Sequence, residues 1–339
     1  MILRLTSQPG GDDVFRLVAA LLVSASQAMT AAPVASAPFV EHEARVFASL
    51  AQAAYCGKND EFAAALSRWD CGPCVDSGVG VVPGSVRVIE TEDRHKDNAT
   101  VTYVARLSAD GPFGDACLLS VRGTTNVANW VRNFQFWKED IAVPNCNGCR
   151  VEFGFATIWE EVRPVVLDAL REVGCLPNGE VSGDNAKATT SAVYVTGHSM
   201  GAAVSTMAMM TLHTLGYTVL PTYLFESPRV GNQAFVDAFM GIFNQSRPVW
   251  RVTFAKDPVP SLPPRALGYR HVPYEVHYDT DGSYRPCEFP LDPMCSEHLV
   301  DDLHHIQDHC TSPLTPPGNI CGCYLNPGEV GPAQKTILV

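Results

Sequence analysis

The hexapeptide Thr196-Gly-His-Ser-Met-Gly201 constrains the fold of this chain more than any other stretch. It fits the pattern G-x-S-x-G. An apolar, β-branched run over residues 191–195 precedes it, and an Ala- and Met-rich run of helical length follows. These runs predict a buried strand that passes directly into a buried helix at Ser199. At so sharp a turn the serine hydroxyl stands above the edge of a sheet, and Gly197 and Gly201 lack side chains that would collide where backbone segments crowd.

Apolar runs of strand and helix length alternate along the rest of the chain. Strands are expected at Ser85–Thr91, Thr100–Leu107, Ala116–Val121, Val219–Phe225 and Val249–Phe254, and helices near Pro38–Cys56, Phe155–Val173 and Gln233–Phe243. Apolar strand interiors and alternation with helices are typical of a parallel sheet buried on both faces. The sequence therefore predicts an α/β protein with a mostly parallel central sheet and helices on both faces. Pro164 should kink the second helix or mark a boundary in it.

The length and the charge of the chain limit its organisation and its partners. Its 339 residues are enough for a large core, and the spacing of the predicted elements indicates one domain. The net charge is −12 and lysine or arginine clusters are missing from the sequence. This argues against nucleic-acid binding and against electrostatic docking on anionic membranes. We expect a monomer.

The N-terminus has the layout of a secretory signal. Arg4 and Arg16 precede the apolar run Leu17–Val23, which is too short to span a bilayer, and small residues follow. We expect a signal peptide over residues 1–28, with cleavage between 25 and 37, and a secreted, extracellular protein without a transmembrane segment. Twelve cysteines agree with an oxidising compartment, where the sequons at Asn98 and Asn244 permit glycosylation.

Two Cys-x-x-Cys pairs, Cys71 with Cys74 and Cys146 with Cys149, allow more than one interpretation. Such a pair can be a redox motif or half of a zinc site. In a secreted chain without a matching second pair of ligands, a structural disulfide is the simplest interpretation. We therefore predict two local disulfides, no metal site and no cofactor.

A serine hydroxyl is a good nucleophile only when a histidine takes its proton and a carboxylate holds that histidine. Asp257 directly follows the predicted strand Val249–Phe254, so it should lie at the same sheet edge as Ser199, where an orienting acid must stand. A plain turn aspartate beside a proline would look the same. Spacing does not choose the base among the downstream histidines, which are His271, His277, His298, His304, His305 and His309.

Six motifs together resemble those of one family. They are Ala53-Ala-Tyr-Cys-Gly-Lys-Asn59, Arg122-Gly-Thr124, Asn129-Trp130, Gly197-His-Ser-Met-Gly201, Ser227-Pro-Arg-Val-Gly-Asn232 and Lys256-Asp-Pro-Val-Pro260. Through them the chain resembles the fungal class 3 lipase family over nearly all of residues 38–310, and the resemblance implies an α/β-hydrolase fold. We expect a catalytic domain over residues 38–311 and a Pro-, Gly- and Cys-containing tail over residues 312–339.

The resemblance assigns roles to three side chains. By position, Ser199 resembles the family nucleophile and Asp257 the family acid. The family base lies in an Asp-His pair shortly after a Cys…Cys-Ser hairpin. Because Cys287…Cys295-Ser296 followed by Asp308-His309 is similar, we expect His309 to be the base.

The chain also departs from the family pattern. Aromatic residues usually follow the base, whereas Cys310 follows it here, and His304 and His305 therefore remain alternative bases. Ala202 stands where glycine is usual after the nucleophile motif. His271 resembles a structural histidine of the family rather than a catalytic one.

Two further parts of a catalytic site are expected. The backbone N–H of Met200, which follows the nucleophile at the start of a helix, is a natural oxyanion donor, and by resemblance Thr124 is the second. Residues 126–134 read as a short amphipathic helix, and the resemblance implies that this helix is a lid. Its apolar side chains are Val127, Trp130, Val131 and Phe134.

The remaining cysteines are harder to pair. Cys287 and Cys295 fit a hairpin-like loop, and Cys56 resembles a cysteine that is tied to the C-terminal tail, where Cys310, Cys321 and Cys323 compete for it. Cys117 lies inside a predicted buried strand, and we expect it to be a free core residue.

These features predict a secreted serine carboxylic ester hydrolase, most simply a triacylglycerol lipase that cleaves acylglycerols at an oil–water interface through an acyl-enzyme on Ser199. A feruloyl or other cell-wall esterase of the same family is the nearest alternative. An inactive secreted binding protein is an alternative of another class, and acyl transfer to an alcohol other than water is a third possibility.

Overall fold

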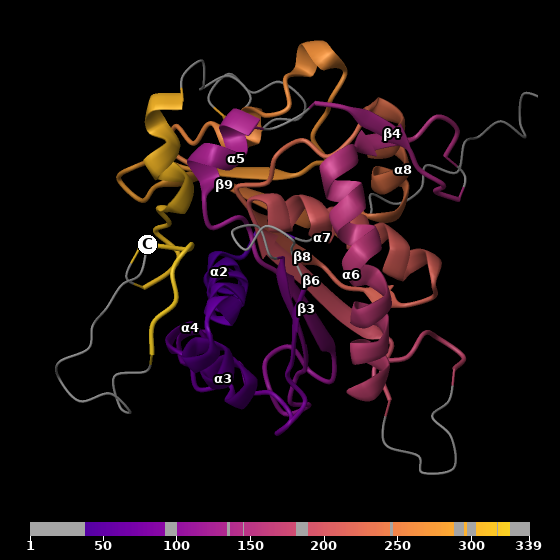
Figure 1. The fold of residues 1–339 in the computed structure, drawn as a ribbon, viewed down its shortest axis with the longest axis vertical. Coiled ribbons are helices and arrows are strands. Elements are labelled where there is room, and N and C mark those ends of the chain that lie inside the picture. The colour runs from indigo at the N-terminus through magenta and orange to yellow at the C-terminus, as the bar shows by residue number, and fades with distance from the viewer. Residues whose placement is uncertain are drawn as a thin grey trace, which may run out of the picture. The chain divides into compact units, whose positions relative to one another are not determined.

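Parallel strands form the middle of the central sheet and antiparallel strands its two edges (Figure 1). The computed structural model describes residues 38–91, 100–133, 136–144, 146–180, 189–244, 247–287, 295–296, 303–316 and 318–325. Within these residues the sheet order is β1 (Arg87–Glu90), β2 (Val101–Arg106), β3 (Cys117–Val121), β6 (Ala192–His198), β8 (Thr222–Phe225), β9 (Val249–Phe254), β10 (Glu275–Tyr278) and β11 (Tyr284–Pro286), with β7 (Thr218–Val219) beside β6. Strands β3 to β10 are parallel to one another, which confirms the predicted mostly parallel sheet.

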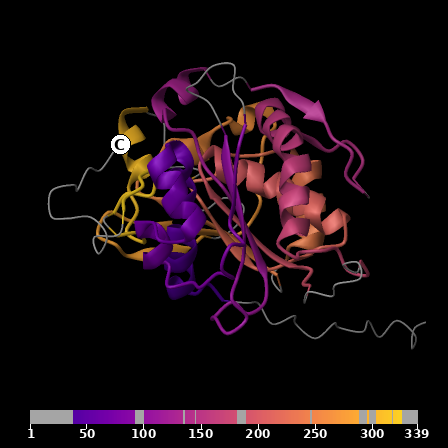
Figure 2. The ribbon, with the colours of Figure 1, turned by 60° about the horizontal axis from the view of Figure 1, so that its bottom comes forward.

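Helices cover both faces of this sheet (Figures 1 and 2). One face packs against α6 (Phe153–Glu172), α7 (Met200–Thr214) and α8 (Gln233–Ile242), and the other against α2 (Glu41–Ala53), α3 (Asp60–Arg68) and α4 (Gly72–Asp76). The smaller elements are α5 (Val127–Asn133), the hairpin of β4 (Lys138–Asp140) and β5 (Arg150–Glu152), and the 3-10 segments η1 (Ala54–Lys58), η2 (Val259–Ser261), η3 (Arg265–Leu267) and η4 (Leu303–Cys310).

Successive side chains of the strands contribute alternately to two hydrophobic cores, one on each face of the sheet. Tyr103 and Leu118 belong to the cluster under α2, whereas their chain neighbours Val104 and Leu119 belong to the cluster under α6 and α7. Successive side chains of a strand point to opposite faces, so a strand that is apolar at every position is needed when both faces are covered. For this reason the strands are continuous apolar runs in the sequence.

Two elements differ from the sequence prediction. Pro164 was expected to kink the helix or mark a boundary; α6 continues past it, so it is not a boundary, and it lies on the exposed side of the helix. Helix α3 was not expected, although Asn59 caps it by accepting a hydrogen bond from the N–H of Phe62 at 3.0 Å. The residues 1–28, Asn98, Phe134 and His298 lie outside the described part of the chain.

Strand β10 was also not predicted from the sequence. Two of its four residues, Glu275 and His277, are polar and buried, so the strand has no apolar run. Neighbouring β9 satisfies them: Arg251 forms an ion pair with Glu275 at 2.9 Å, and the hydroxyl of Thr253 hydrogen-bonds to His277 Nδ1 at 2.9 Å. A polar ladder between two strands replaces apolar packing here.

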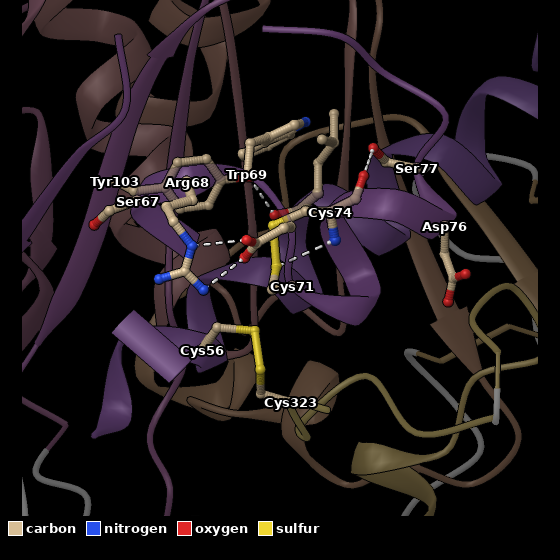
Figure 3. The surroundings of a disulfide bond; sticks show 12 residues. Cys56, Ser67, Arg68, Trp69, Cys71, Cys74, Asp76, Ser77, Tyr103 and Cys323 are labelled. Atoms are coloured by element: carbon tan, nitrogen blue, oxygen red, sulfur yellow. Dashed lines mark hydrogen bonds and ion pairs between the residues drawn. A yellow bond between two sulfur atoms is a disulfide. The ribbon is translucent and has the colours of Figure 1, made fainter. Parts of the chain in front are cut away.

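Six disulfides join all twelve cysteines. Cys71 pairs with Cys74, Cys146 with Cys149, Cys287 with Cys295, and Cys56 with Cys323 of the tail; Figure 3 shows the first and the last of these pairs near each other. Cys310 pairs with Cys321.

The expectation that Cys117 is free is wrong. It forms a disulfide with Cys175, which lies just after α6, and both are fully buried in the cluster between the sheet and that helix. The partner is 58 residues away, so spacing along the chain gave no indication of it.

The described part of the predicted tail packs on the body of the protein. Leu314, Ile320 and Cys323 are buried in the cluster under α2. Gln52 of α2 donates hydrogen bonds to the carbonyls of Asn319 and Gly322, at 2.7 and 3.0 Å. No helix within the described residues is long and apolar enough to cross a membrane.

Candidate active site

Ser199 occupies a strained turn between β6 and α7. Its φ is 59° and its ψ is −133°, a conformation that side-chain-bearing residues rarely adopt. The turn is possible because Gly197 and Gly201 have no side chains at two points where backbone segments approach closely. A Cβ on Gly197 would lie 2.7 Å from the carbonyl oxygen of Gly201, and a Cβ on Gly201 would collide with the carbonyl of Val121 in β3. The sequence prediction of a strand–turn–helix at this serine is therefore correct.

Asp257 and His309 meet in the same region. His309 Nδ1 lies 2.7 Å from Asp257 Oδ2, and both side chains are almost completely buried. The other oxygen of Asp257 accepts a hydrogen bond from the N–H of Val259 at 2.9 Å. Because the carboxylate can only accept, Nδ1 carries the proton and Nε2 of His309 is the nitrogen that can accept one.

The alternative histidines lie elsewhere. His304 is exposed, and His305 lies 3.7 Å from Asp308 rather than near Asp257. His271 is buried and hydrogen-bonds to the carbonyl of Pro260 at 2.6 Å, in the turn that follows Asp257. Burial, followed by the charges of Arg251 and Arg229, lowers the pKa of His271 well below its ordinary value, so it is a neutral packing group.

The buried atoms without a hydrogen-bond partner within the described residues include the hydroxyl of Ser199 and Nε2 of His309. Buried polar atoms are normally paired, so a pair of unsatisfied ones marks a place where chemistry rather than stability has determined the side chains. They are the two atoms between which a serine nucleophile and its base exchange a proton.

The turn after β3 lies against the nucleophile. The register of β3 and β6 pairs Val121 with Gly197, and a Cβ on Gly123 would lie 2.8 Å from Cβ of Ser199. Thr124 follows at once and is buried; its hydroxyl accepts a hydrogen bond from the N–H of Asn126 at 3.3 Å. Of the two predicted oxyanion donors, Met200 directly follows Ser199 at the start of α7, and Thr124 directly follows Gly123, which lies against Ser199.

A buried hydrogen-bond chain that the sequence did not reveal supports these groups. His198 Nε2 lies 2.9 Å from the carbonyl of His309, and His198 Nδ1 lies 2.7 Å from the hydroxyl of Tyr55. Burial, followed by the neighbouring His309, lowers the pKa of His198 well below its ordinary value, and burial raises the pKa of Tyr55. Both groups are therefore neutral, and they connect η1, the nucleophile turn and the segment of the base.

A second buried carboxyl group, Glu226, was also missed. It follows β8 directly, and burial together with the nearby Asp257 carboxylate raises its pKa well above the ordinary value. An acidic residue soon after an apolar strand pointed to Asp257, and Glu226, directly after Thr222–Phe225, has a similar position in the sequence.

Helix α5 begins shortly after Thr124. Val131 is buried, Val127 is half-buried, and the half-buried Trp130 stacks on Phe155 of α6 with ring centroids 6.3 Å apart. A cavity of about 50 Å³ remains beneath Thr124 and Val127, and Ser199 has no exposed surface. The structure is therefore a closed form in which substrate cannot reach the serine.

One set of potential metal ligands occurs within the described residues, namely Glu275, Cys287 and Cys295. The two sulfur atoms are joined in a disulfide, so they offer no thiolate to a metal ion.

Known proteins share this fold and sequence. The family model described as Lipase (class 3) matches residues 118–267. Secreted mono- and diacylglycerol lipase 1 of Fusarium solani is 32% identical over 276 residues, which cover 77% of this chain and 74% of that protein. Secreted mono- and diacylglycerol lipase A of Penicillium cyclopium is 35% identical over 176 residues, about half (52%) of each chain.

Solved structures agree with the fold. The Rhizomucor miehei lipase propeptide complex superimposes with a TM-score of 0.60 at 23% identity, over 84% of this chain and 83% of that one. The mono- and diacylglycerol lipase from Aspergillus oryzae gives 0.59 at 26% identity, over 80% and 96%. The fold is thus the α/β-hydrolase fold, and the extended match to the Fusarium protein shows the family: the chain belongs to the class 3 lipases, which are carboxylic ester hydrolases.

Proposed function

We propose that this protein is a secreted serine hydrolase that cleaves acylglycerol esters through an acyl-enzyme on Ser199. The observation that carries the proposal is the buried Asp257–His309 pair, 2.7 Å apart, whose free nitrogen and the hydroxyl of Ser199 are both left without partners among the described residues. The names of the relatives from Fusarium and Penicillium favour a secreted enzyme and acylglycerol substrates.

The mechanism follows from which atoms can hold a proton. Ser199 Oγ gives its proton to His309 Nε2 as the oxygen attacks the ester carbonyl carbon, and Asp257 stabilises the resulting imidazolium. The N–H of Met200 and Thr124 donate to the negative oxygen of the tetrahedral intermediate. Collapse breaks the bond to the glycerol oxygen, which takes the proton from His309, and water then repeats the two steps to release the fatty acid.

The closed form makes a conformational step necessary. Ser199 is fully buried, and α5 begins shortly after Thr124, whose preceding residue Gly123 lies against Ser199, so we infer that α5 is a lid. Exposed apolar side chains lie close to the hairpin that follows it: Trp137 is 63% exposed, and the backbone of Phe153, itself 49% exposed, hydrogen-bonds to Trp137. Lys138 extends to the carbonyl of Leu267, a third exposed apolar residue. Such a patch is suited to contact with a lipid surface.

Two assays test the lipid preference. We expect the rate to rise sharply when the concentration of a glycerol ester passes its solubility limit, because the lipid surface favours the open lid; a plain saturating curve would argue that α5 stays fixed. The rates of hydrolysis of monoolein, diolein and triolein, compared with that of methyl ferulate, distinguish an acylglycerol lipase from a cell-wall esterase. Faster cleavage of methyl ferulate would reject the lipid preference.

Covalent labelling tests the catalytic assignment. An organophosphate should form one adduct on Ser199 in the folded protein when detergent or lipid is present, and Ser199→Ala should form none. His309→Ala should slow labelling, whereas the neighbouring His305→Ala should not. Absence of an adduct on Ser199 in folded wild-type protein would leave the inactive binding protein as the better interpretation.

A further inference from the structure

Glu226 lies at the catalytic edge of the sheet, between the nucleophile and the acid. The register pairs Phe225 of β8 with His198 of β6 on one side and with Val252 of β9 on the other. Since these strands are parallel, the residues that follow them emerge at the same edge. Ser199 follows β6, Glu226 follows β8 and Asp257 follows β9 after a short turn.

The position of Glu226 is unfavourable for a glutamate in two respects. Its φ is 48°, in the left-handed region that suits glycine, and its N–H is held there by a 2.9 Å hydrogen bond to the carbonyl of Val252. The side chain is only 4% exposed, and its Oε2 has no hydrogen-bond partner within the described residues. A strained backbone and an incompletely satisfied buried acid both destabilise the fold, so neither explains why a carboxyl group stands here.

The surroundings of Glu226 are acidic. The charged groups that act on it are Asp257, Glu275 and Asp308. The buried Arg251 forms an ion pair with Glu275 at 2.9 Å and is not among the charged groups that act on Glu226. Burial, followed by the charge and the hydrogen bond of Asp257, raises the pKa of Glu226 well above its ordinary value, so the group keeps its proton at neutral pH.

A protonated carboxyl group can donate one hydrogen bond, and Asp257 is the acceptor within reach. Asp257 would then accept from three directions: from His309 Nδ1 at 2.7 Å, from the N–H of Val259 at 2.9 Å, and from Glu226. Three donors fix the plane of the carboxylate and hence the direction of the imidazole ring that it holds.

We propose that Glu226 is a positioning residue of the catalytic triad, which as a neutral acid donates a hydrogen bond to Asp257 and so orients His309 and sets its basicity. The inference rests on the proposed roles of Asp257 and His309.

The hydrogen bond has a predictable effect on His309. It draws negative charge from Asp257, which then stabilises the imidazolium less, so loss of this bond should move the acid limb of the pH–rate profile to higher pH. When Glu226 loses its proton in alkali, a second negative charge lies beside Asp257, the hydrogen bond is lost and the two carboxylates repel. The wild-type enzyme should therefore lose activity at high pH because Glu226 ionises.

Three variants and one control separate these effects. Glu226→Gln keeps a donor that cannot ionise, Glu226→Leu fills the space without a donor, and Glu226→Gly removes the donor while suiting the φ of 48°. Glu152→Gln is the matched control, because Glu152 is also a buried acid with a raised pKa but caps α6 away from Asp257. kcat and kcat/KM for p-nitrophenyl butyrate are measured from pH 5 to pH 10.

We expect Glu226→Gln to keep the acid-limb midpoint of wild type and to lose the alkaline decline. Glu226→Leu and Glu226→Gly should move the acid-limb midpoint up by about one pH unit and lower kcat about tenfold with little change in KM, since a hydrogen bond to a charged group is lost. The low-field NMR signal of the His309 Nδ1 proton should titrate with the same shift, a readout that needs no turnover.

Equal acid-limb midpoints in wild type, Glu226→Leu and Glu226→Gly would overturn the proposal and make Glu226 a structural acid only, and so would an alkaline decline that persists in Glu226→Gln. If Glu226→Leu fails to fold, the glycine variant, which relieves the backbone strain, gives the result. A wild-type protein that cleaves no ester would instead reject the proposed function, and the NMR titration would still show whether Glu226 acts on His309.

Discussion

Replacing Tyr55 with phenylalanine tests whether the buried chain behind the nucleophile holds the catalytic base. The carbonyl of His309 can only accept, so His198 Nε2 carries a proton and donates it over 2.9 Å. In neutral His198, Nδ1 must therefore accept, and the hydroxyl of Tyr55 is its donor at 2.7 Å. Tyr55→Phe removes that donor and keeps the ring.

The size of the effect follows from burial. His198 has no exposed surface and Tyr55 is 3% exposed, so solvent does not replace the lost hydrogen bond without a rearrangement. Leaving a buried acceptor unsatisfied costs about 1–3 kcal/mol, which lowers the folding equilibrium constant about 5- to 150-fold. His198 is hydrogen-bonded to the backbone carbonyl of His309, so a shift of the His198 ring displaces the base. We therefore expect kcat to fall about tenfold.

Tyr103→Phe is the matched control. Tyr103 is also a buried tyrosine, and its hydroxyl donates to the carbonyl of Leu50 at 2.7 Å, but Ser120 donates to the same carbonyl at 3.1 Å. The control therefore leaves no acceptor without a partner. It should lose less stability than Tyr55→Phe and keep the wild-type kcat.

Urea unfolding with the disulfides intact gives the free energies, and hydrolysis of p-nitrophenyl butyrate, normalised by organophosphate titration of active sites, gives kcat. Equal stability losses in Tyr55→Phe and Tyr103→Phe, with wild-type kcat in both, would refute the argument that this chain positions His309.

Four more outcomes follow from the structure. Thr124→Val should reduce kcat by about two orders of magnitude, about 3 kcal/mol, with nearly unchanged unfolding, while Thr124→Ser keeps most activity; wild-type turnover in the valine variant would remove the hydroxyl's role. Ser199→Gly and Ser199→Ala should both be inactive, but the glycine variant should be about 1 kcal/mol more stable in urea because it relieves the φ of 59°. Replacing both Cys310 and Cys321 with serine opens a loop with a sequence separation of 11, which should cost about 3 kcal/mol, and kcat should fall as well because Cys310 adjoins the base. Burial raises the pKa of Glu152 from 4.5 to about 7, so between these pH values the folded protein holds a proton that the unfolded chain releases. The free energy of unfolding of the wild type should therefore fall as the pH rises from 4.5 to 7, by at most about 1.4 kcal/mol per pH unit. Urea titrations at pH 5 and pH 8 should show a smaller loss for Glu152→Gln.

The sequence predicted the parts of the site that follow apolar strands. Ser199 and Asp257 each come after a continuous apolar run, and parallel strands bring such residues to one edge. The pattern therefore predicted the position of both, but the resemblance was needed to distinguish Asp257 from a plain turn aspartate. His309 lies in η4, which has no such pattern, and only the resemblance to a family selected it from six histidines. A residue held by a loop and by disulfides has no periodic signal.

The groups that support the site were harder to find. Tyr55 lies in η1 and acts through His198, 143 residues away, so no local pattern links the two. The disulfide of Cys117 spans 58 residues, and a cysteine inside an apolar strand looks the same whether it is free or paired. Contacts over such distances depend on how the helices pack on the sheet, which the spacing of apolar residues does not specify.

One repeated backbone feature explains why the chemistry gathers at this edge. Three of the four non-glycine residues with positive φ within the described chain come directly after β6, β8 and β9, and they are Ser199, Glu226 and Ala255. The N–H of each continues the sheet by bonding to the next strand, at 2.9, 2.9 and 2.8 Å. The chain thus keeps its last ladder bond and then turns sharply, which lifts the following side chains above the sheet instead of along it. Each turn stores about 1–3 kcal/mol of strain, and the ladder bonds and the two covered faces hold it in place. A serine, two carboxyl groups and their histidine can therefore meet in a buried site that a relaxed end of the sheet would not form.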